Sequence, residues 1–296
     1  MTANKEKTVY ALGFFDGVHL GHQALLAACC GLAQKSGCKA GAVTFGIHPE
    51  TLVAGQAPKL LGTSLQRKAL LSCYGMEQVL VLPFDEALRN KPWRVFLEEL
   101  EAKGAAGFVC GDDFRFGFRG EGNAALLEAY CLEKGLLWAV VPGQSLDGQR
   151  ISSTHIRKCI EEGDMEQAVR FLGHAHVLSG QVVSGRKLGR TLGIPTANLH
   201  LPEGVVVPKF GVYACKALAE GKQYLAVTNV GMRPTVGGSH VTVEPWLLDF
   251  EGDLYGKELT LQFYSFLRPE EKFPSLEALK QQIVRDAERV KEILQS

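Results

Sequence analysis

The chain has 296 residues, a length typical of two domains; 46% of its residues are hydrophobic and 22% are charged. This composition is that of an ordinary globular protein and excludes a disordered or collagen-like chain. Lys and Arg number 32, as do Asp and Glu, so no global field favours nucleic acid or an anionic membrane as a partner. There is no run of about 18 apolar residues, which excludes a transmembrane helix. The apolar run near the N-terminus is too short for a secretory signal, so we expect a cytoplasmic location.

Over the first 150 residues, short apolar runs alternate with longer amphipathic segments. The short runs are β-branched or aromatic and end at Gly, Pro or Asp, which indicates buried strands. The longer segments have helical spacing, and several end at a glycine. The alternation predicts a doubly wound α/β domain with a parallel sheet, whose ligands bind beyond the carboxyl ends of the strands. The expected strands are 8–15, 39–46, 78–84, 105–111 and 136–141, and the expected helices are 22–37, 64–75, 93–104 and 123–135.

In the second half, the pattern of apolar runs and turn residues is different. Two short helices are expected over 152–172, and after residue 175 short strand-like runs are divided by Gly, Pro, Asn and Asp turns. This spacing is typical of a small antiparallel barrel or sandwich, and we favour the barrel. An amphipathic helix over 275–294 closes the chain. We therefore expect domains of residues 1–174 and 175–296, with barrel strands at 176–185, 211–218, 223–231, 240–250 and 258–267.

Two histidines lie where the first strand leads into a helix. In GFFDGVHLGH, His19 and His22 are three residues apart, which places their side chains about 5–6 Å apart on a helix. The free N–H groups and the dipole of a helix N-terminus favour an anion there. Two imidazoles beside a phosphate would donate hydrogen bonds and neutralise growing negative charge. The pattern therefore indicates a phosphate-handling site.

This motif resembles the signature of the nucleotidyltransferase superfamily, and the N-terminal half more narrowly resembles bacterial FMN adenylyltransferases. The matching stretches are GFFDGVHLGHQ, TFGIHP, GDDFRFG and RISSTHIR. The resemblance implies that His19 and His22 stabilise the α-phosphoryl group of ATP during its transfer. It also implies nucleotide contacts from Gly13, Phe15, Asp16, Gly17, Gly21, Arg150, Ser153, Thr154 and Arg157, and flavin-side contacts from Thr44, Phe45, Asp113 and Phe114. The chain departs from the family pattern at Phe14, where Asn is usual, and at Gly46 and Ile47.

A second phosphate-binding segment follows in SGRKLGRTLGIPTANL, residues 184–199. It does not match the Walker pattern, which excludes a P-loop NTPase. The glycines and basic residues nevertheless suit a cationic flap for a triphosphate. Oxygen atoms of Thr196 and Asn198 are suitable partners for Mg²⁺ or phosphate. The alternative is that this segment is a Gly-rich hairpin whose charged side chains are solvated and bind no ligand.

Residues 175–295 resemble the riboflavin kinase domain through IPTANL, GVYAC, TNVGMRPT, VEPWLLDF and LRPEEKF. The resemblance implies that Thr196 and Asn198 bind Mg²⁺ and ATP and that Glu244 is the general base. A carboxylate suits this reaction because the nucleophile is a neutral alcohol, the riboflavin 5′-hydroxyl. Further implied contacts are Gly185, Lys187 and Gly189 for the nucleotide and Arg268 for the flavin. Val236 and Pro245 depart from the family pattern.

The order of the two halves resembles the bacterial bifunctional riboflavin kinase/FAD synthetase family. The expected function is ATP-dependent conversion of riboflavin to FMN, followed by adenylylation of FMN to FAD, with Mg²⁺ assisting both steps. The expected partners are thus riboflavin, FMN, FAD and ATP, without nucleic acid or membrane, and the sequence carries no signal for oligomeric state. Two alternatives stay open: transfer to another phosphorylated acceptor, and a flavin-binding regulator with inactive sites.

Overall fold

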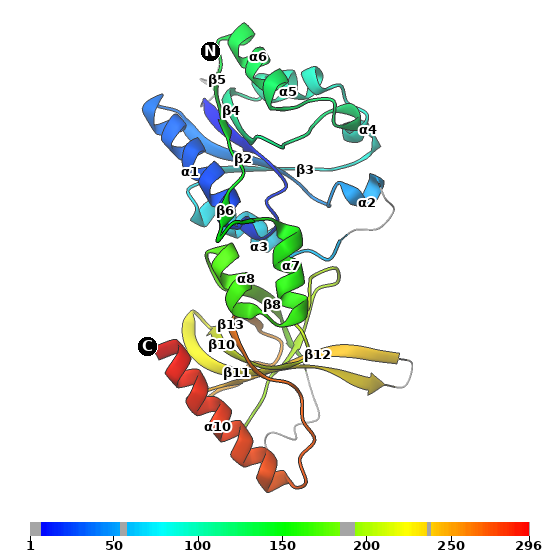
Figure 1. Ribbon diagram of the computed structural model, residues 1–296, viewed down its shortest axis with the longest axis vertical. Helices are drawn as coiled ribbons and strands as arrows, with labels where there is room; N and C mark the ends of the chain where they lie inside the picture. Colours follow the sequence, from blue (N-terminus) through cyan, green and yellow to red (C-terminus); the bar gives the residue numbers. More distant parts are fainter. Residues whose placement is uncertain (1–6, 54–57, 184–192, 236–237, 296) are drawn as a thin grey trace. The chain divides into compact units, whose positions relative to one another are not determined.

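The computed structural model describes residues 7–53, 58–183, 193–235 and 238–295. The chain divides into two compact units, one of residues 1–59 and 63–153 and the other of residues 60–62 and 154–296. Figure 1 labels the main helices and strands of both units. Within the described residues, no helix is both long and apolar enough to cross a membrane.

The first unit is a five-stranded parallel sheet with the order β3-β2-β1-β4-β5. Successive residues of β1 point to opposite faces, so Val9 packs with α1 and α3, whereas Tyr10 packs with α5 and α6. The sheet is therefore covered on both sides, as the doubly wound prediction requires. The bounds are β1 Thr8–Leu12, η1 Asp16–Val18, α1 Leu20–Lys35, β2 Lys39–Phe45, α2 Glu50–Val53, α3 Ser64–Cys73, β3 Gln78–Leu82, α4 Glu86–Arg89, α5 Trp93–Ala102, β4 Ala105–Gly111, η2 Phe118–Gly120, α6 Ala124–Lys134, β5 Leu137–Val141, β6 Ser145–Leu146 and β7 Gln149–Arg150.

The second unit is a closed barrel of six strands with the order β10-β11-β12-β9-β8-β13. Its helix α8 packs against β8 and β13, and α7 precedes it across Gly163, whose φ of 84° ends the first of the two expected short helices. The barrel prediction is confirmed, together with the terminal helix. The bounds are α7 Ser153–Glu162, α8 Met165–Leu172, β8 His176–Val183, β9 Asn198–His200, β10 Gly211–Ala219, β11 Lys222–Thr235, β12 Gly238–Leu247, β13 Glu258–Arg268 and α10 Leu276–Gln295.

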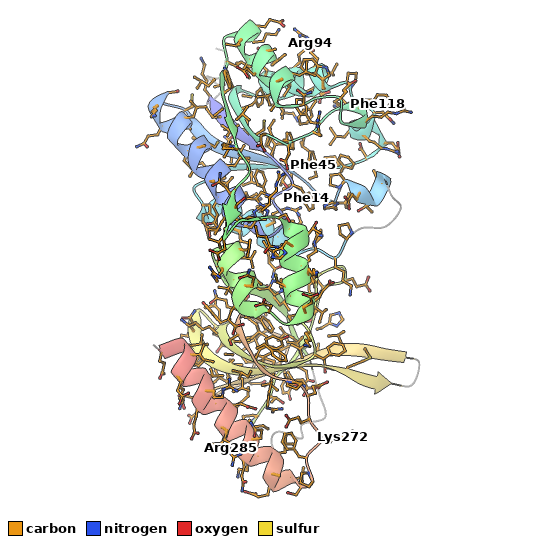
Figure 2. The ribbon with its side chains drawn as sticks, viewed as in Figure 1. Phe14, Phe45, Arg94, Phe118, Lys272 and Arg285 are labelled. Atoms are coloured by element: carbon orange, nitrogen blue, oxygen red, sulfur yellow. The ribbon has the colours of Figure 1, made fainter. Side chains whose placement is uncertain are left out.

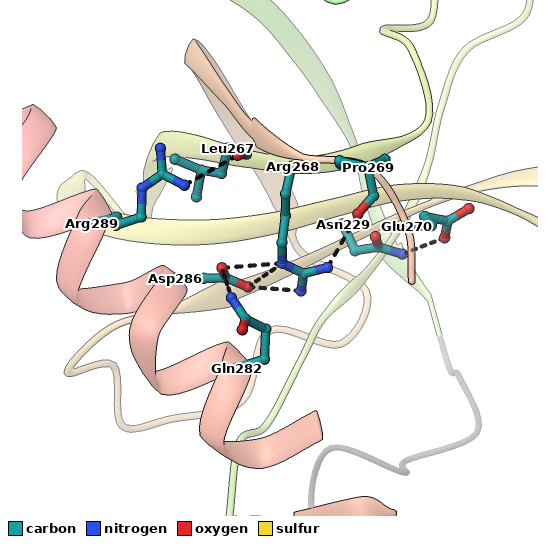
Figure 3. A network of polar contacts seen from close by, with 8 residues as sticks. All are labelled: Asn229, Leu267, Arg268, Pro269, Glu270, Gln282, Asp286 and Arg289. Atoms are coloured by element: carbon teal, nitrogen blue, oxygen red, sulfur yellow. Dashed lines mark hydrogen bonds and ion pairs between the residues drawn. The ribbon is translucent and has the colours of Figure 1, made fainter. Parts of the chain in front are cut away.

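The C-terminal helix α10 is fixed to the barrel by apolar packing and by one buried ion pair. Ala287 and Val290 pack against β10 and β11 residues such as Val212 and Val227. The side chain of Asp286 is 1% exposed and accepts hydrogen bonds from Arg268 Nε at 3.0 Å and Nη2 at 2.8 Å (Figure 3). Because Arg268 ends β13, this pair joins the helix to the end of a barrel strand.

Removing one partner of this pair leaves the other buried and uncompensated. We expect Asp286→Asn to lower the free energy of unfolding by about 3 kcal/mol, measured by urea denaturation. Replacing both partners, as in Arg268→Met with Asp286→Leu, should recover part of that loss because no unpaired charge remains. Equal losses in the single and double variants would contradict this account.

A buried histidine on β8 makes the stability depend on pH. His176 is 1% exposed, and burial lowers its pKa from 6.5 to about 3. The unfolded chain therefore takes up a proton below pH 6.5 that the folded chain refuses, so stability falls as the pH drops from 6.5 toward 3. The free energy of unfolding should fall by about 1.4 kcal/mol per pH unit from this group. His176→Leu should flatten the slope by that amount in urea titrations at pH 7 and pH 5, and an unchanged slope would refute the assignment.

Candidate functional sites

In the first unit, a cavity of about 230 Å³ lies at the carboxyl ends of β1, β4 and β5. Parallel sheets bind ligands at this edge because the strand ends and the helix N-termini meet there. The cavity collects segments that are far apart in sequence. Its lining includes Gly13, Phe14, Phe15, His19, Gly21, His22, Asp112, Asp113, Phe114, Gly143, Arg150 and Ser153.

The two histidines form a stacked pair at the start of α1. Their ring centroids are 3.6 Å apart with 12° between the planes. His19 caps the helix, because its Nδ1 accepts a hydrogen bond from the backbone N–H of His22 at 3.3 Å. In the neutral ring this acceptor role leaves the proton of His19 on Nε2. Burial lowers the pKa of His22 well below 6.5, and the neighbouring His19 lowers it further, so His22 is neutral at pH 7.

The turn before these histidines is strained and has no room for larger side chains. Phe15 has φ of 61° and Val18 has φ of 41°, values that L-residues rarely adopt. A Cβ at Gly13 would lie 2.9 Å from the Phe15 ring, and one at Gly21 would lie 3.2 Å from the His19 ring. Gly17, with φ of 74°, turns the chain between them. The glycines in the motif therefore let the backbone pass close to the cavity.

Two hydroxyl groups hold the carbonyls of this turn. Thr44 is buried and its Oγ1 donates to the Phe14 carbonyl at 2.8 Å, so it supports the turn and does not line the cavity. Ser153 Oγ donates to the Asp16 carbonyl at 3.0 Å. Both hydroxyls thus fix the backbone that presents the histidines.

The charged residues at the mouth of this cavity are paired with each other. Arg150 Nη2 lies 2.5 Å from Asp113 Oδ2, and both side chains are more than half exposed. An exposed pair of this kind contributes little stability, so it costs little to exchange Asp113 for a phosphate. Thr154 and Arg157 lie one turn apart on α7 in the second unit, with Arg157 Nη1 3.5 Å from Thr154 Oγ1.

A second and larger cavity of the first unit, about 520 Å³, is lined by aromatic rings and arginines. Of the candidate residues that the structure describes, Phe45 alone belongs to its lining, together with Phe84, Phe96 and Phe116. The Phe45 and Phe84 rings meet edge to face at 5.4 Å. Neither Phe84 nor Phe116 stands out in the sequence, because Phe84 ends a short apolar run that reads equally well as core, and Phe116 lies among arginines and glycines in a loop-like segment. Arg89, Arg115 and Arg119 add positive charge to this aromatic cavity.

In the second unit, Thr196 lies between two cavities. One, of about 280 Å³, is also lined by Asn229, Glu244, Trp246 and Arg268. The other, of about 80 Å³, is lined by Phe250, Asp253 and Tyr255 among others. A side chain shared by two adjoining cavities is positioned to contact ligands in both.

The segment around Thr196 is fixed to the strand that carries Glu244. The backbone N–H of Ala197 donates to the Pro245 carbonyl at 2.9 Å, and Asn198 begins β9, which pairs with β8 and β12. Glu244 is half-buried and stands opposite Asn229 in the β11–β12 register. The structure therefore brings Thr196 and Glu244 to one cavity. Pro245 does not interrupt the pairing on either side.

Polar residues that line the 280 Å³ cavity of the second unit take part in a hydrogen-bond network (Figure 3). Asn229 Nδ2 donates to Glu270 Oε1 at 3.2 Å, and Arg268 Nη1 donates to the Pro269 carbonyl at 3.2 Å. Arg268 lines the cavity as expected, although its Nε and Nη2 are already bonded to Asp286. The implied contacts Gly185, Lys187 and Gly189, and the departure at Val236, lie outside the described residues.

Comparison with known proteins gives both halves a family. The family model described as FAD synthetase matches residues 1–155, and the one described as riboflavin kinase matches residues 172–294. A solved structure titled as a macrolide-efflux protein from Streptococcus pneumoniae has a TM-score of 0.89 at 29% identity, covering 98% of this chain and 95% of that one. Because its title names a different activity, we take from it the fold alone.

Three relatives carry the name bifunctional riboflavin kinase/FMN adenylyltransferase. The protein from Listeria monocytogenes is 35% identical and the alignment covers 94% of this chain and 90% of the relative. The protein from Pseudomonas fluorescens is 38% identical with the same coverage, and that from Escherichia coli K12 is 36% identical over 96% and 92%. The chain therefore belongs to the family of bifunctional riboflavin kinases/FMN adenylyltransferases, with the two activities in the order expected from its sequence.

Proposed function

We propose that the cavity beside His19 and His22 is where FMN is adenylylated by ATP. A phosphate oxygen of FMN attacks the α-phosphorus of ATP, the bond from that phosphorus to the bridging oxygen breaks, and pyrophosphate leaves. The nucleophile is already an anion, so the site needs positioning and charge stabilisation more than a base. The observation that carries this assignment is the stacked histidine pair at the N-terminus of α1. Arg150 and Ser153, which line this cavity, are assigned to the nucleotide phosphates, whereas nucleotide contacts from Thr154 and Arg157 stay predictions.

The aromatic cavity is the assigned place for the flavin ring of FMN. The rings of Phe45, Phe84 and Phe116 offer apolar and stacking surface to a planar heterocycle. Asp113 and Phe114 line the histidine cavity, and Phe114 stacks on Phe116 with centroids 5.7 Å apart. Phe114 and Phe116 thus link the linings of the two cavities, which suits an acceptor with its ring in one and its phosphate directed to the other.

Phosphorylation of riboflavin is assigned to the second unit. The flavin would occupy the cavity of Glu244 and Trp246, and the nucleotide the cavity of Phe250 and Tyr255, because Thr196 borders both. Glu244 would accept the proton of the 5′-hydroxyl as its oxygen attacks the γ-phosphorus of ATP, and ADP leaves. The fixed position of the Thr196–Asn198 segment against Pro245 supports this arrangement.

Mg²⁺ fits the donor set at Thr196 and Asn198. A hydroxyl and an amide oxygen are hard neutral ligands, which suit an ion held mainly by nucleotide phosphates. Bound there, Mg²⁺ would supply charge neutralisation of the phosphate oxygens. The functional limits 1–174 and 175–296 and a cytoplasmic location remain predictions.

Glu244→Gln should abolish FMN formation because an amide cannot accept the proton of the 5′-hydroxyl. Conversion of added FMN to FAD should continue at the wild-type rate, because it is assigned to different residues. Chromatography of riboflavin, FMN and FAD over time measures both steps. Unchanged FMN formation would remove Glu244 as the base.

His19→Ala combined with His22→Ala should have the reverse effect. FAD formation from FMN should fall by at least about a hundredfold, since two groups that stabilise the transferring phosphoryl are lost. Riboflavin phosphorylation in the same preparation serves as the control that the second unit is folded and active. FAD synthesis that survives in the double variant would overturn the assignment of this cavity.

A further inference from the structure

The first unit contains a buried cation that neither of the assigned steps uses. Arg67 lies on α3 and is 2% exposed. Its Nη2 donates to the Phe45 carbonyl at 2.6 Å, whereas Nε and Nη1 have no hydrogen-bond partner among the residues that the structure describes. Unpaired buried donors on a charged group are costly, so they call for a ligand or another explanation.

Arg67 contacts the walls of both cavities of the first unit. Its guanidinium carbon lies 4.1 Å from the centre of the Phe14 ring, and Phe14 lines the histidine cavity. Phe45, whose carbonyl it binds, lines the aromatic cavity. Figure 2 labels Phe14 and Phe45 at the same end of the sheet. Arg67 itself lines neither cavity, so the cation lies behind one wall residue of each.

The charge of Arg67 is permanent and only partly compensated. Burial lowers its pKa from 12.5, and the charge of Asp16 offsets part of that effect, so the guanidinium stays protonated at pH 7. The cation that lines the histidine cavity, Arg150, is exposed and paired with Asp113. A dianionic phosphate moving toward His19 and His22 would meet Arg67 as a desolvated cation, where charge-assisted hydrogen bonds are strong.

We propose that Arg67 binds the phosphate of FMN through its unpaired N–H groups and so determines the preference of adenylyl transfer for a phosphorylated flavin. This inference rests on the assignment of the transfer to the histidine cavity. Because both donors are covered in the structure, a phosphate reaches them only when a covering side chain moves. The Phe14 ring, whose centre lies 4.1 Å from the guanidinium carbon and which is itself only partly buried, is the candidate for that movement.

The test is Arg67→Met in the full chain, with FMN and ATP as substrates. The KM for FMN should rise about tenfold or more, as expected for losing hydrogen bonds to a charged group. The KM for ATP should stay within about twofold. The inhibition constant of lumiflavin, which has the flavin ring but no phosphate and no hydroxyl to phosphorylate, should also stay unchanged. Arg67→Lys, which keeps a cation, should recover part of the affinity for FMN.

Lys68→Met is the matched control, because Lys68 is the next residue of α3 and is exposed. Riboflavin phosphorylation in each variant reports whether the second unit is folded, and an unchanged KM for ATP in adenylyl transfer reports that the first unit is folded. An unchanged KM for FMN overturns the proposal. So does a parallel rise in the KM for FMN, the KM for ATP and the lumiflavin constant, which would mean that Arg67 only supports Phe14 and Phe45. FAD synthesis that survives loss of both histidines would instead overturn the cavity assignment on which this inference rests.

Discussion

The candidate adenylyltransferase site depends on the strained turn between β1 and α1. Phe15 and Val18 adopt a positive φ, at a cost of about 1–3 kcal/mol each. Both side chains are fully buried in the core beneath the turn, and that packing offsets the strain. The turn ends at His19, which caps the helix and stacks on His22. The position of both imidazoles is thus a consequence of how Phe15 and Val18 pack.

The reaction of the second unit has a different kind of nucleophile and therefore needs different side chains. Its nucleophile is a neutral hydroxyl, which gains from a carboxylate, whereas the nucleophile of the first unit is an anion that gains from cations and N–H donors. Glu244, the proposed base, lies on a barrel strand whose position is fixed by the β11–β12 register and by the hydrogen bond from Ala197 to Pro245. A closed barrel suits this role because every strand that borders the cavity is paired on both sides.

The sequence allowed the architecture to be predicted because both halves have strong periodic patterns. It did not allow β9 to be found, since the three residues Asn198–His200 are too few to show a period. The first strand was expected to reach residue 15 because Phe14 and Phe15 are apolar, but β1 ends at Leu12 and Phe15 turns to a positive φ. In α10, the sequence pattern does indicate a buried carboxylate. Asp286 lies three residues from Ile283 and four from Val290, on the apolar face of the helix.

Other site residues could not be identified from the sequence, because the sequence does not show the direction in which their side chains point. Arg67 lies in an amphipathic helix where an arginine ordinarily faces water, and nothing local to the sequence says that it is buried. Phe84 and Phe116 contribute to one cavity only because β3 and β4 end at the same edge of the sheet. Tertiary contact, which a periodic pattern does not encode, brings these residues together.

The departures from the expected family pattern in the first unit, at Phe14 and in the loop after β2, are physically connected. Phe14, at the position where the resemblance leads us to expect Asn, meets the Arg67 guanidinium on its face and the His48 ring edge to face at 4.6 Å. His48 belongs to the loop after β2 in which Gly46 and Ile47 also depart from the pattern. An asparagine at position 14 would be too small to contact both groups at these distances, although its amide oxygen could accept from Arg67. The aromatic ring therefore joins α3 to the altered loop, and changes at position 14 and in that loop should be judged together.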